Sequence, residues 1–221
     1  MSPAITVALL WTAFGASHMA MSSLRLRPAL VARMGERGFA AVYSLLSLAL
    51  FVPLVWVYFA NKHTGAVLWQ LPVGAGLEWS IIIAMGVAFV MLVSGLMQPS
   101  AASMGSGEVQ TRGILLITRH PMFMAMALFG ALHLVANGST TDVAFFGGFP
   151  LFSLLGTWHQ DRRKLAQGLP GYRRFCESTP YLPFSGSRTV EGLRGLPPAA
   201  VLIGIAVTAL LRYYHGAWFG G

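Results

Sequence analysis

Two histidines, His18 and His133, lie in apolar stretches with no carboxylate nearby in the sequence to pair with them. If each stretch is helical, residues three, four and seven positions away share a face with the histidine. The residues on these faces are aromatic, small or soft: Trp11, Phe14 and Gly15 with His18, and Met126, Phe129 and Gly130 with His133. A glycine one turn away lets a flat group approach the backbone, and two neutral imidazoles from separate helices can hold haem iron in a bundle. The pattern predicts such a haem pocket, with both histidines as metal ligands; alternatively, each histidine hydrogen-bonds a carbonyl or a serine of a neighbouring helix.

A second group of polar residues lies at Arg119-His120-Pro121, where the proline favours the start of a helix. A guanidinium and an imidazole beside the positive end of a helix form a site for an anion or a carboxylate. Asp161, one of only seven acidic residues, is a candidate companion. Two interpretations stay open: the pair contributes to a cofactor site, or Arg119 has a structural role and binds lipid phosphate or Asp161.

Apolar stretches of the length needed to cross a bilayer, about 20 residues, carry these side chains. The predicted spans are 3–22, 39–60, 79–97, 121–136, 143–158 and 196–211. Residues 113–120 are expected at the membrane interface, and residues 160–195 are expected to form a polar loop between the last two spans.

The composition supports a membrane protein. Of the 221 residues, 55% are hydrophobic and 10% are charged, whereas a soluble globular protein has about 25% charged residues. These values exclude a soluble α/β enzyme and a disordered chain, and the single cysteine, Cys176, excludes a domain held together by disulfides. The predicted fold class is all-α: one domain over residues 1–221, a polytopic membrane bundle of about six transmembrane helices.

The basic residues predict an orientation. The net charge of +8 is interpreted as loop orientation and contact with anionic membrane lipid, with no nucleic-acid partner. Twelve of the fifteen Lys and Arg residues fall in loops on one side of the predicted spans and two on the other, with Arg119 at the membrane. The positive-inside rule then places residues 160–195 in the cytoplasm and both termini away from it. We expect a multi-pass protein of a bacterial inner membrane.

Several short motifs, in this order, resemble the NnrU family and its relatives, the 15-cis-zeta-carotene isomerases. The matching segments are HMAMSSLRLR at 18–27, GERGF at 35–39, YSLLSL at 43–48, LW at 68–69, ITRHP at 117–121, ALH at 131–133, DRR at 161–163, and STP with PF at 178–184. The likeness extends over residues from about 10 to 185, and the ordered set is more specific than any one of its motifs.

The resemblance implies an integral membrane protein with haem b, held by two histidines that correspond to His18 and His133. In these isomerases, ferrous haem supports a redox-neutral cis-trans isomerisation of the central 15–15′ double bond of a poly-cis carotene. The resemblance therefore implies catalytic roles for both histidines, a lipophilic, carotenoid-like substrate and an electron donor for the haem. One departure is Gly130, which stands where the plant enzyme has a cysteine one turn before the second histidine, so a thiolate ligand switch is not expected here.

The depths of the histidines leave a second ligand assignment open. Counted from the predicted interfaces, His18 lies ~10 Å and His133 ~18 Å into the membrane at ~1.5 Å per residue. Axial ligands of one iron should be nearly level. His120 matches the depth of His18 and is kept as the alternative ligand.

Two other functions stay open. The C-terminal half also resembles membrane methyltransferases of the isoprenylcysteine carboxyl type, in which an Arg-His-Pro motif and a later acidic pair hold S-adenosylmethionine. Here Arg119-His120-Pro121 is present, but the acidic pair is reduced to Asp161-Arg162. The third hypothesis is a non-catalytic NnrU factor linked to denitrification.

Overall fold

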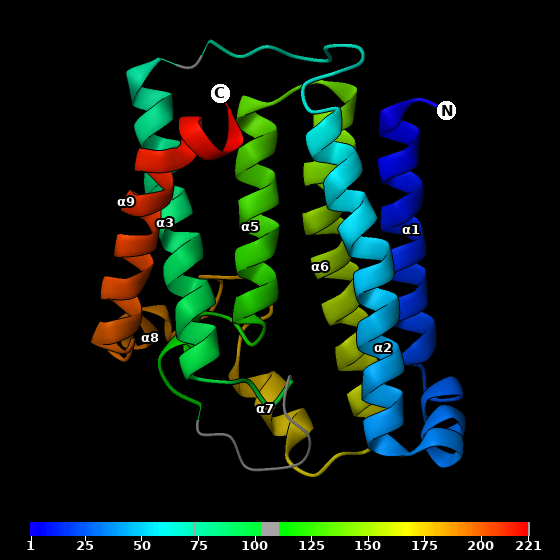
Figure 1. The fold of residues 1–221 in the computed structure, drawn as a ribbon. Coiled ribbons are helices and arrows are strands. Elements are labelled where there is room, and N and C mark those ends of the chain that lie inside the picture. Colours follow the sequence, from blue (N-terminus) through cyan, green and yellow to red (C-terminus); the bar gives the residue numbers. More distant parts are fainter. Residues whose placement is uncertain (73, 103–110, 221) are drawn as a thin grey trace.

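The computed structural model describes residues 1–72, 74–102 and 111–220, and in these residues the chain is helical and forms no strand, apart from one isolated bridge between Val67 and Ser139. The long helices are α1 (Pro3–Met21), α2 (Leu26–Ala60), α3 (Ala75–Met97), α5 (Pro121–Ala136), α6 (Thr140–Ala166) and α9 (Pro198–Phe219) (Figure 1). The short helices α4 (Ile114–Ile117), α7 (Tyr172–Ser178) and α8 (Thr189–Arg194) lie between the long helices in the chain. The predicted all-α bundle is confirmed.

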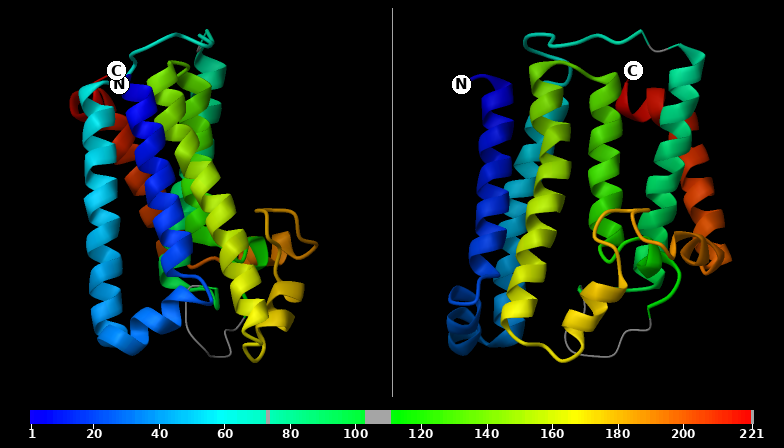
Figure 2. Two further views of the ribbon diagram at one scale, coloured as in Figure 1. Left: turned by 90° about the vertical axis from the view of Figure 1, so that its right-hand side faces the viewer. Right: turned by 180° about the vertical axis from the view of Figure 1, so that it is seen from behind.

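The long helices form a layered row, which Figures 1 and 2 show from three sides. α6 packs against α1 and against α5, α5 packs against α3, and α3 packs against α9, while α2 packs mainly against α1. Both termini lie at one end of the bundle, called here the terminal end. The opposite end, with α4, α7 and α8, is called the loop end.

Four of the described helices, α1, α2, α3 and α9, are long and apolar enough to cross a membrane by length and composition. α5 is apolar but has only 16 residues. Large apolar side chains point outward from the bundle: Trp56 is 73% exposed, Ile83 66% and Leu202 68%. Such broad apolar surfaces are rare on monomeric soluble proteins, and they suit the hydrocarbon of a bilayer.

α1 and α5 have the bounds that the sequence predicts, to within one residue, but the predicted loop before residue 39 is partly wrong. α2 already begins at Leu26, and its dihedral angles leave the helical region only at Gly35, with φ 74° and ψ 167°. This region is accessible mainly to glycine. The break divides α2 into a short segment that lies across the loop end and a long segment that runs to Ala60 (Figure 2).

α6 continues past its predicted end at residue 158 to Ala166. Two polar side chains of this extension are bound to the segment before residue 103: Gln160 Nε2 donates to the carbonyl of Ala102 at 2.6 Å, and Lys164 Nζ donates to the carbonyl of Ala101 at 2.7 Å. The hydropathy of the sequence does not predict these contacts, because the acceptor carbonyls lie about 60 residues earlier in the chain.

α9 also extends past its predicted end at residue 211, to Phe219. Arg212, where the apolar stretch stops, forms an ion pair with Glu78 of α3. The pairing of the two charges allows the helix to continue through them.

Residues 113–118 and His120 are buried, and Arg119 is partly buried, whereas the sequence predicts an interfacial position for 113–120. The four side chains of α4 are at most 2% exposed. α8 covers them at close range: a Cβ added to Gly192 would lie 2.9 Å from the side chain of Ile117. This contact between α4 and α8 closes the loop end of the bundle beside α3.

Candidate functional site

The surface of α6 between α1 and α5 carries a stripe of phenylalanines, called here the α6 aromatic stripe: Phe145, Phe146, Phe149 and Phe152. Both of the predicted histidine faces pack against this stripe. Phe149 contacts Trp11 of α1, with ring centroids 5.1 Å apart, and Phe129 of α5, with centroids 5.4 Å apart. None of the predicted sites includes this stripe, although positions 145, 149 and 152 have the helical spacing that could have revealed it.

Trp11 fixes α1 against α6. Its indole Nε1 donates to the carbonyl of Phe145 at 3.0 Å. The indole lies on Gly148, where an added Cβ would come within 2.2 Å of it. Phe14, one turn further along α1, packs on Phe152 with ring centroids 4.9 Å apart, and a Cβ on Gly15 would be in ordinary contact with the same ring. The predicted face of α1 is therefore an aromatic contact with α6.

His18 lies at the same contact and is held by two hydrogen-bond partners. Nδ1 lies 2.7 Å from the carbonyl of Phe14, and Nε2 lies 3.1 Å from Ser47 Oγ of α2. Because a carbonyl can only accept, Nδ1 carries the proton of the neutral ring, and Nε2 keeps its lone pair. The hydroxyl of Ser47 beside it also donates to the carbonyl of Tyr43, at 2.7 Å. A hydrogen bond to a serine of a neighbouring helix is one of the alternatives that the sequence left open.

His133 has the same tautomer in a different setting. Nδ1 lies 2.9 Å from the carbonyl of Phe129, so Nε2 again keeps its lone pair. Among the described residues, the structure gives Nε2 no hydrogen-bond partner. The ring stacks on Phe146 of α6, with centroids 4.4 Å apart and an angle of 17° between the planes.

The chemistry of these two donors fits haem iron, because each ring is anchored through Nδ1 and offers Nε2. Their placement does not fit one iron. His18 contacts Phe152 and His133 contacts Phe146, which are six residues apart on α6, or about 9 Å along its axis. The ring of Phe149, between these two levels on α6, contacts both helices that carry the histidines, through Trp11 of α1 and Phe129 of α5. The structure therefore brings both histidines to one aromatic stripe, at two levels.

The remaining predicted residues on α5 also face α6. Gly130 lies close to the backbone of α6: a Cβ added to this glycine would come within 2.5 Å of the carbonyl oxygen of Phe146 and 2.7 Å of Phe149 Cβ. The room left by this glycine is thus occupied by α6, which packs closely there. Met126, one turn earlier, is half-buried.

Arg119 and His120 lie in a separate cluster at the loop end and bind Asp161. Arg119 Nε is 2.8 Å from Asp161 Oδ2, and His120 Nε2 is 2.9 Å from Oδ1. Tyr172 of α7 donates its hydroxyl to Oδ1 at 2.6 Å. Arg119 also donates to the carbonyl of Thr179 at 3.0 Å. The carboxylate expected near Arg119 is therefore Asp161, and His120 is bound at Nε2.

The electrostatics of this cluster favour an ionised Asp161. Burial alone would raise the pKa of its carboxyl, but the hydrogen bonds and charges of His120, Tyr172 and Arg119 hold that pKa below its usual value. Burial and the hydrogen bond to Asp161 raise the pKa of the Tyr172 phenol, which stays neutral. The cluster ties α7 and the start of α5 to the end of α6, and this is a structural role.

The cavity beside Arg119 and His120 has a volume of about 30 Å³ among the described residues. This is about the share of one water molecule in the liquid. A cavity of this size holds water and not a nucleoside.

Cys176 lies on α7 at the loop end. Burial, together with the charge of Asp161, raises the pKa of its thiol. His133 is in the last turn of α5, toward the terminal end, so this cysteine is remote from it.

A family model described as NnrU protein matches residues 6–221. The 15-cis-zeta-carotene isomerase, chloroplastic, of Arabidopsis thaliana is 28% identical over 201 residues, which cover 89% of this chain and 53% of the relative. The protein of the same name from Zea mays is 27% identical over 197 residues, which cover 87% of this chain and 52% of the relative. The chain thus spans about half the length of these curated relatives. No solved structure matches.

Proposed function

Because the chain belongs to the NnrU family, we propose that it is a membrane-embedded isomerase of a lipophilic, carotenoid-type polyene. The observation that carries this proposal is the likeness to two proteins named 15-cis-zeta-carotene isomerase over nearly all of this chain. The apolar outer faces of the helices support a substrate that arrives from the bilayer.

The reaction proposed is a cis-trans isomerisation of the central 15–15′ double bond, as the names of the relatives suggest. It is a rotation about one bond, so no atom is added or lost and no net oxidation occurs. The α6 aromatic stripe offers apolar rings and excludes water, which suits a hydrocarbon chain.

We also propose haem b as the cofactor, with His18 and His133 as candidate ligands through Nε2. Their anchored Nδ1 atoms support this proposal. Because the two rings contact α6 at levels about 9 Å apart along its axis, ligation of one iron by both requires α5 to shift relative to α1. We place the 160–195 side of the protein in the cytoplasm, from the excess of Lys and Arg there.

The experiment is expression of the full chain in a carotenoid-producing host that accumulates 9,15,9′-tri-cis-ζ-carotene. The proposal expects the 9,9′-di-cis form, measured by chromatography of the extracted pigments. Membranes that contain folded protein but leave the substrate unchanged would overturn the isomerase function.

The cofactor is tested separately by the visible spectrum of the protein purified from haem-replete cells. A Soret band that His18→Ala or His133→Ala removes or shifts supports ligation by that residue. His159→Ala is the matched control, because this histidine lies near the C-terminal end of α6 and takes part in none of the hydrogen bonds between described residues. A colourless wild-type protein, or identical spectra for all variants, would overturn the haem proposal.

A further inference from the structure

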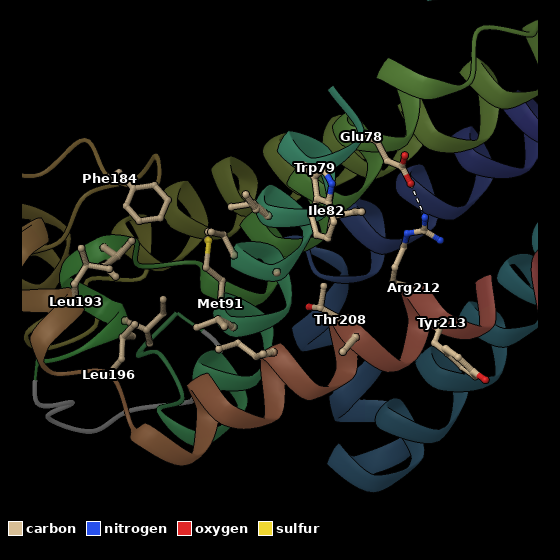
Figure 3. Close-up of a pocket in the computed structure, with 18 residues that line it drawn as sticks. Glu78, Trp79, Ile82, Met91, Phe184, Leu193, Leu196, Thr208, Arg212 and Tyr213 are labelled. Atoms are coloured by element: carbon tan, nitrogen blue, oxygen red, sulfur yellow. Dashed lines mark hydrogen bonds and ion pairs between the residues drawn. The ribbon is translucent and has the colours of Figure 1, made fainter. Parts of the chain in front are cut away.

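A groove with a volume of about 1050 Å³ lies between α3 and α9. Figure 3 shows that side chains of both helices line it and that Phe184, Leu193 and Leu196 border it at the loop end. It lies beyond α5 from the α6 aromatic stripe, because α3 separates α9 from α5 in the row of helices. The groove is thus independent of the site proposed above.

The groove has the dimensions and lining of a site for a hydrocarbon chain. On α3 its lining runs from Glu78 to Met91, which is about 20 Å at 1.5 Å per residue. One leaflet of a bilayer core is about 15 Å deep, half of about 30 Å. Apart from Thr208 and an ion pair at one end, the lining described here is apolar or aromatic.

The two ends of the groove differ in charge. At the terminal end, Glu78 and Arg212 form an ion pair, so this rim carries no net charge (Figure 3). At the loop end, Arg194 lies in the sequence between the lining residues Leu193 and Leu196. Its guanidinium is in none of the ion pairs that the described residues form.

In the tertiary structure the backbone next to a second arginine, Arg112, lies close to the backbone next to Arg194. Gly113 and Gly195 are in backbone contact: a Cβ on Gly113 would come within 2.6 Å of the carbonyl of Gly195, and a Cβ on Gly195 within 3.1 Å of Gly113 Cα. The residues that precede these two glycines are Arg112 and Arg194, both exposed. Arg112 likewise has no ion pair within the described ranges.

We propose that the groove binds one membrane phospholipid, with an acyl chain between α3 and α9 and its phosphate against Arg112 and Arg194. The charge of the loop-end rim is complementary to a phosphate, and guanidinium groups bind phosphate oxygens well. The length of the lining suits an acyl chain that enters from one leaflet. Two features of the site thus specify the occupant: the basic rim suits a phosphate, and the apolar groove suits a hydrocarbon tail.

The test is titration of the detergent-purified full chain with dioleoyl phosphatidylglycerol, with bound lipid counted by native mass spectrometry. Dioleoylglycerol, which has the same tails and no phosphate, is the matched ligand. We expect one tightly bound phosphatidylglycerol and at least tenfold weaker binding of dioleoylglycerol. Arg112→Gln combined with Arg194→Gln should weaken phosphatidylglycerol binding about 30-fold, which corresponds to about 1 kcal/mol for each arginine near a lipid phosphate.

Two pairs of variants separate the groove from general effects. Arg188→Gln removes the same charge at the same end, but Arg188 is already paired with Glu191, so it should leave lipid binding unchanged. Gly86→Leu fills the groove, since a Cβ at Gly86 meets Thr208 at an ordinary 3.7 Å, and it should weaken binding. Gly156→Leu on α6, where a Cβ meets nothing within 4 Å, should not.

A labelling experiment needs no substitution and keeps the proposal testable if a variant fails to fold. Phosphatidylglycerol with a photoreactive group in its acyl chain should label peptides of α3 and α9. Labelling confined to other helices, equal affinity for both lipids, wild-type affinity in the double arginine variant, or a second copy of the chain or a pigment seated in the groove would each overturn the proposal.

Discussion

Replacement of Asp161 by asparagine should strongly destabilise the protein. The carboxylate accepts hydrogen bonds from Arg119, His120 and Tyr172 at 2.6–2.9 Å. The side chain of Asp161 is 8% exposed and that of Arg119 is 15% exposed, so solvent screens this pair little. The asparagine side chain would keep the size of the aspartate but lose its charge, and it would leave the guanidinium buried without a counterion.

Breaking a buried ion pair by the loss of one partner costs about 3–5 kcal/mol. At about 2–4 °C per kcal/mol for a chain of this size, the apparent Tm of the detergent-purified protein should fall by about 6–20 °C. Tryptophan fluorescence during heating measures this change. The matched control is Glu191→Gln, which removes a carboxylate from the exposed pair with Arg188 and should leave the apparent Tm unchanged. If Asp161→Asn stayed within about 2 °C of the wild type, or if the two variants lost equal stability, the cluster would not have the role assigned to it.

Four further predictions concern pH, reactivity and packing. The pKa of Asp161 in the folded protein is held below its usual value. The stabilising contribution of the ionised carboxylate is therefore present above the unfolded pKa of about 3.9 and is lost as pH falls through the folded pKa. The difference in Tm between the wild type and Asp161→Asn should stay constant from pH 7 to about 5 and shrink below pH ~4. Cys176 has a raised thiol pKa, so iodoacetamide at pH 8 should modify it more slowly than the same cysteine in denaturant, as read by mass spectrometry, and equal rates would contradict this. Gly130→Ala should destabilise the folded protein by about 1–3 kcal/mol, because the added Cβ would lie 2.5 Å from the carbonyl oxygen of Phe146. The control is Gly147→Ala, whose added Cβ meets nothing within 4 Å. It should leave the apparent Tm, measured by tryptophan fluorescence during heating, nearly unchanged. Ser47→Ala removes the hydroxyl from His18 Nε2 and should leave haem content unchanged or raise it in a pyridine haemochrome assay; a loss of haem would show that the serine itself supports the ligand.

The helix faces that carry His18 and His133 show which parts of the candidate site can be predicted from the sequence. Helical spacing groups Trp11 and Phe14 with His18, and the structure does place all three on one contact with α6. The count of residues from each interface also indicates different depths for the two histidines, and the structure separates them along α6. Spacing alone gives no partner for either ring, because Ser47 and Phe146 belong to other helices.

The boundaries that the sequence located well are those of apolar segments, such as Pro3–Met21 and Pro121–Ala136. Those it missed contain charges that distant residues neutralise. Lys164 and Arg212 look like solvated positions in the sequence, yet the first donates to the segment before residue 103 and the second pairs with α3. A local pattern cannot report a partner that lies dozens of residues away.

The sequence by itself determined that this chain is an all-helical bundle with helices long and apolar enough to cross a membrane, because apolar length and helical periodicity are local properties. Only the tertiary structure decided which surfaces meet. It placed both histidine faces on α6, bound Arg119 and His120 to Asp161, and brought the backbone next to Arg112 close to the backbone next to Arg194 through two touching glycines. These contacts depend on how helices pack side by side, and that packing is set by complementary shapes and buried charges from the whole chain.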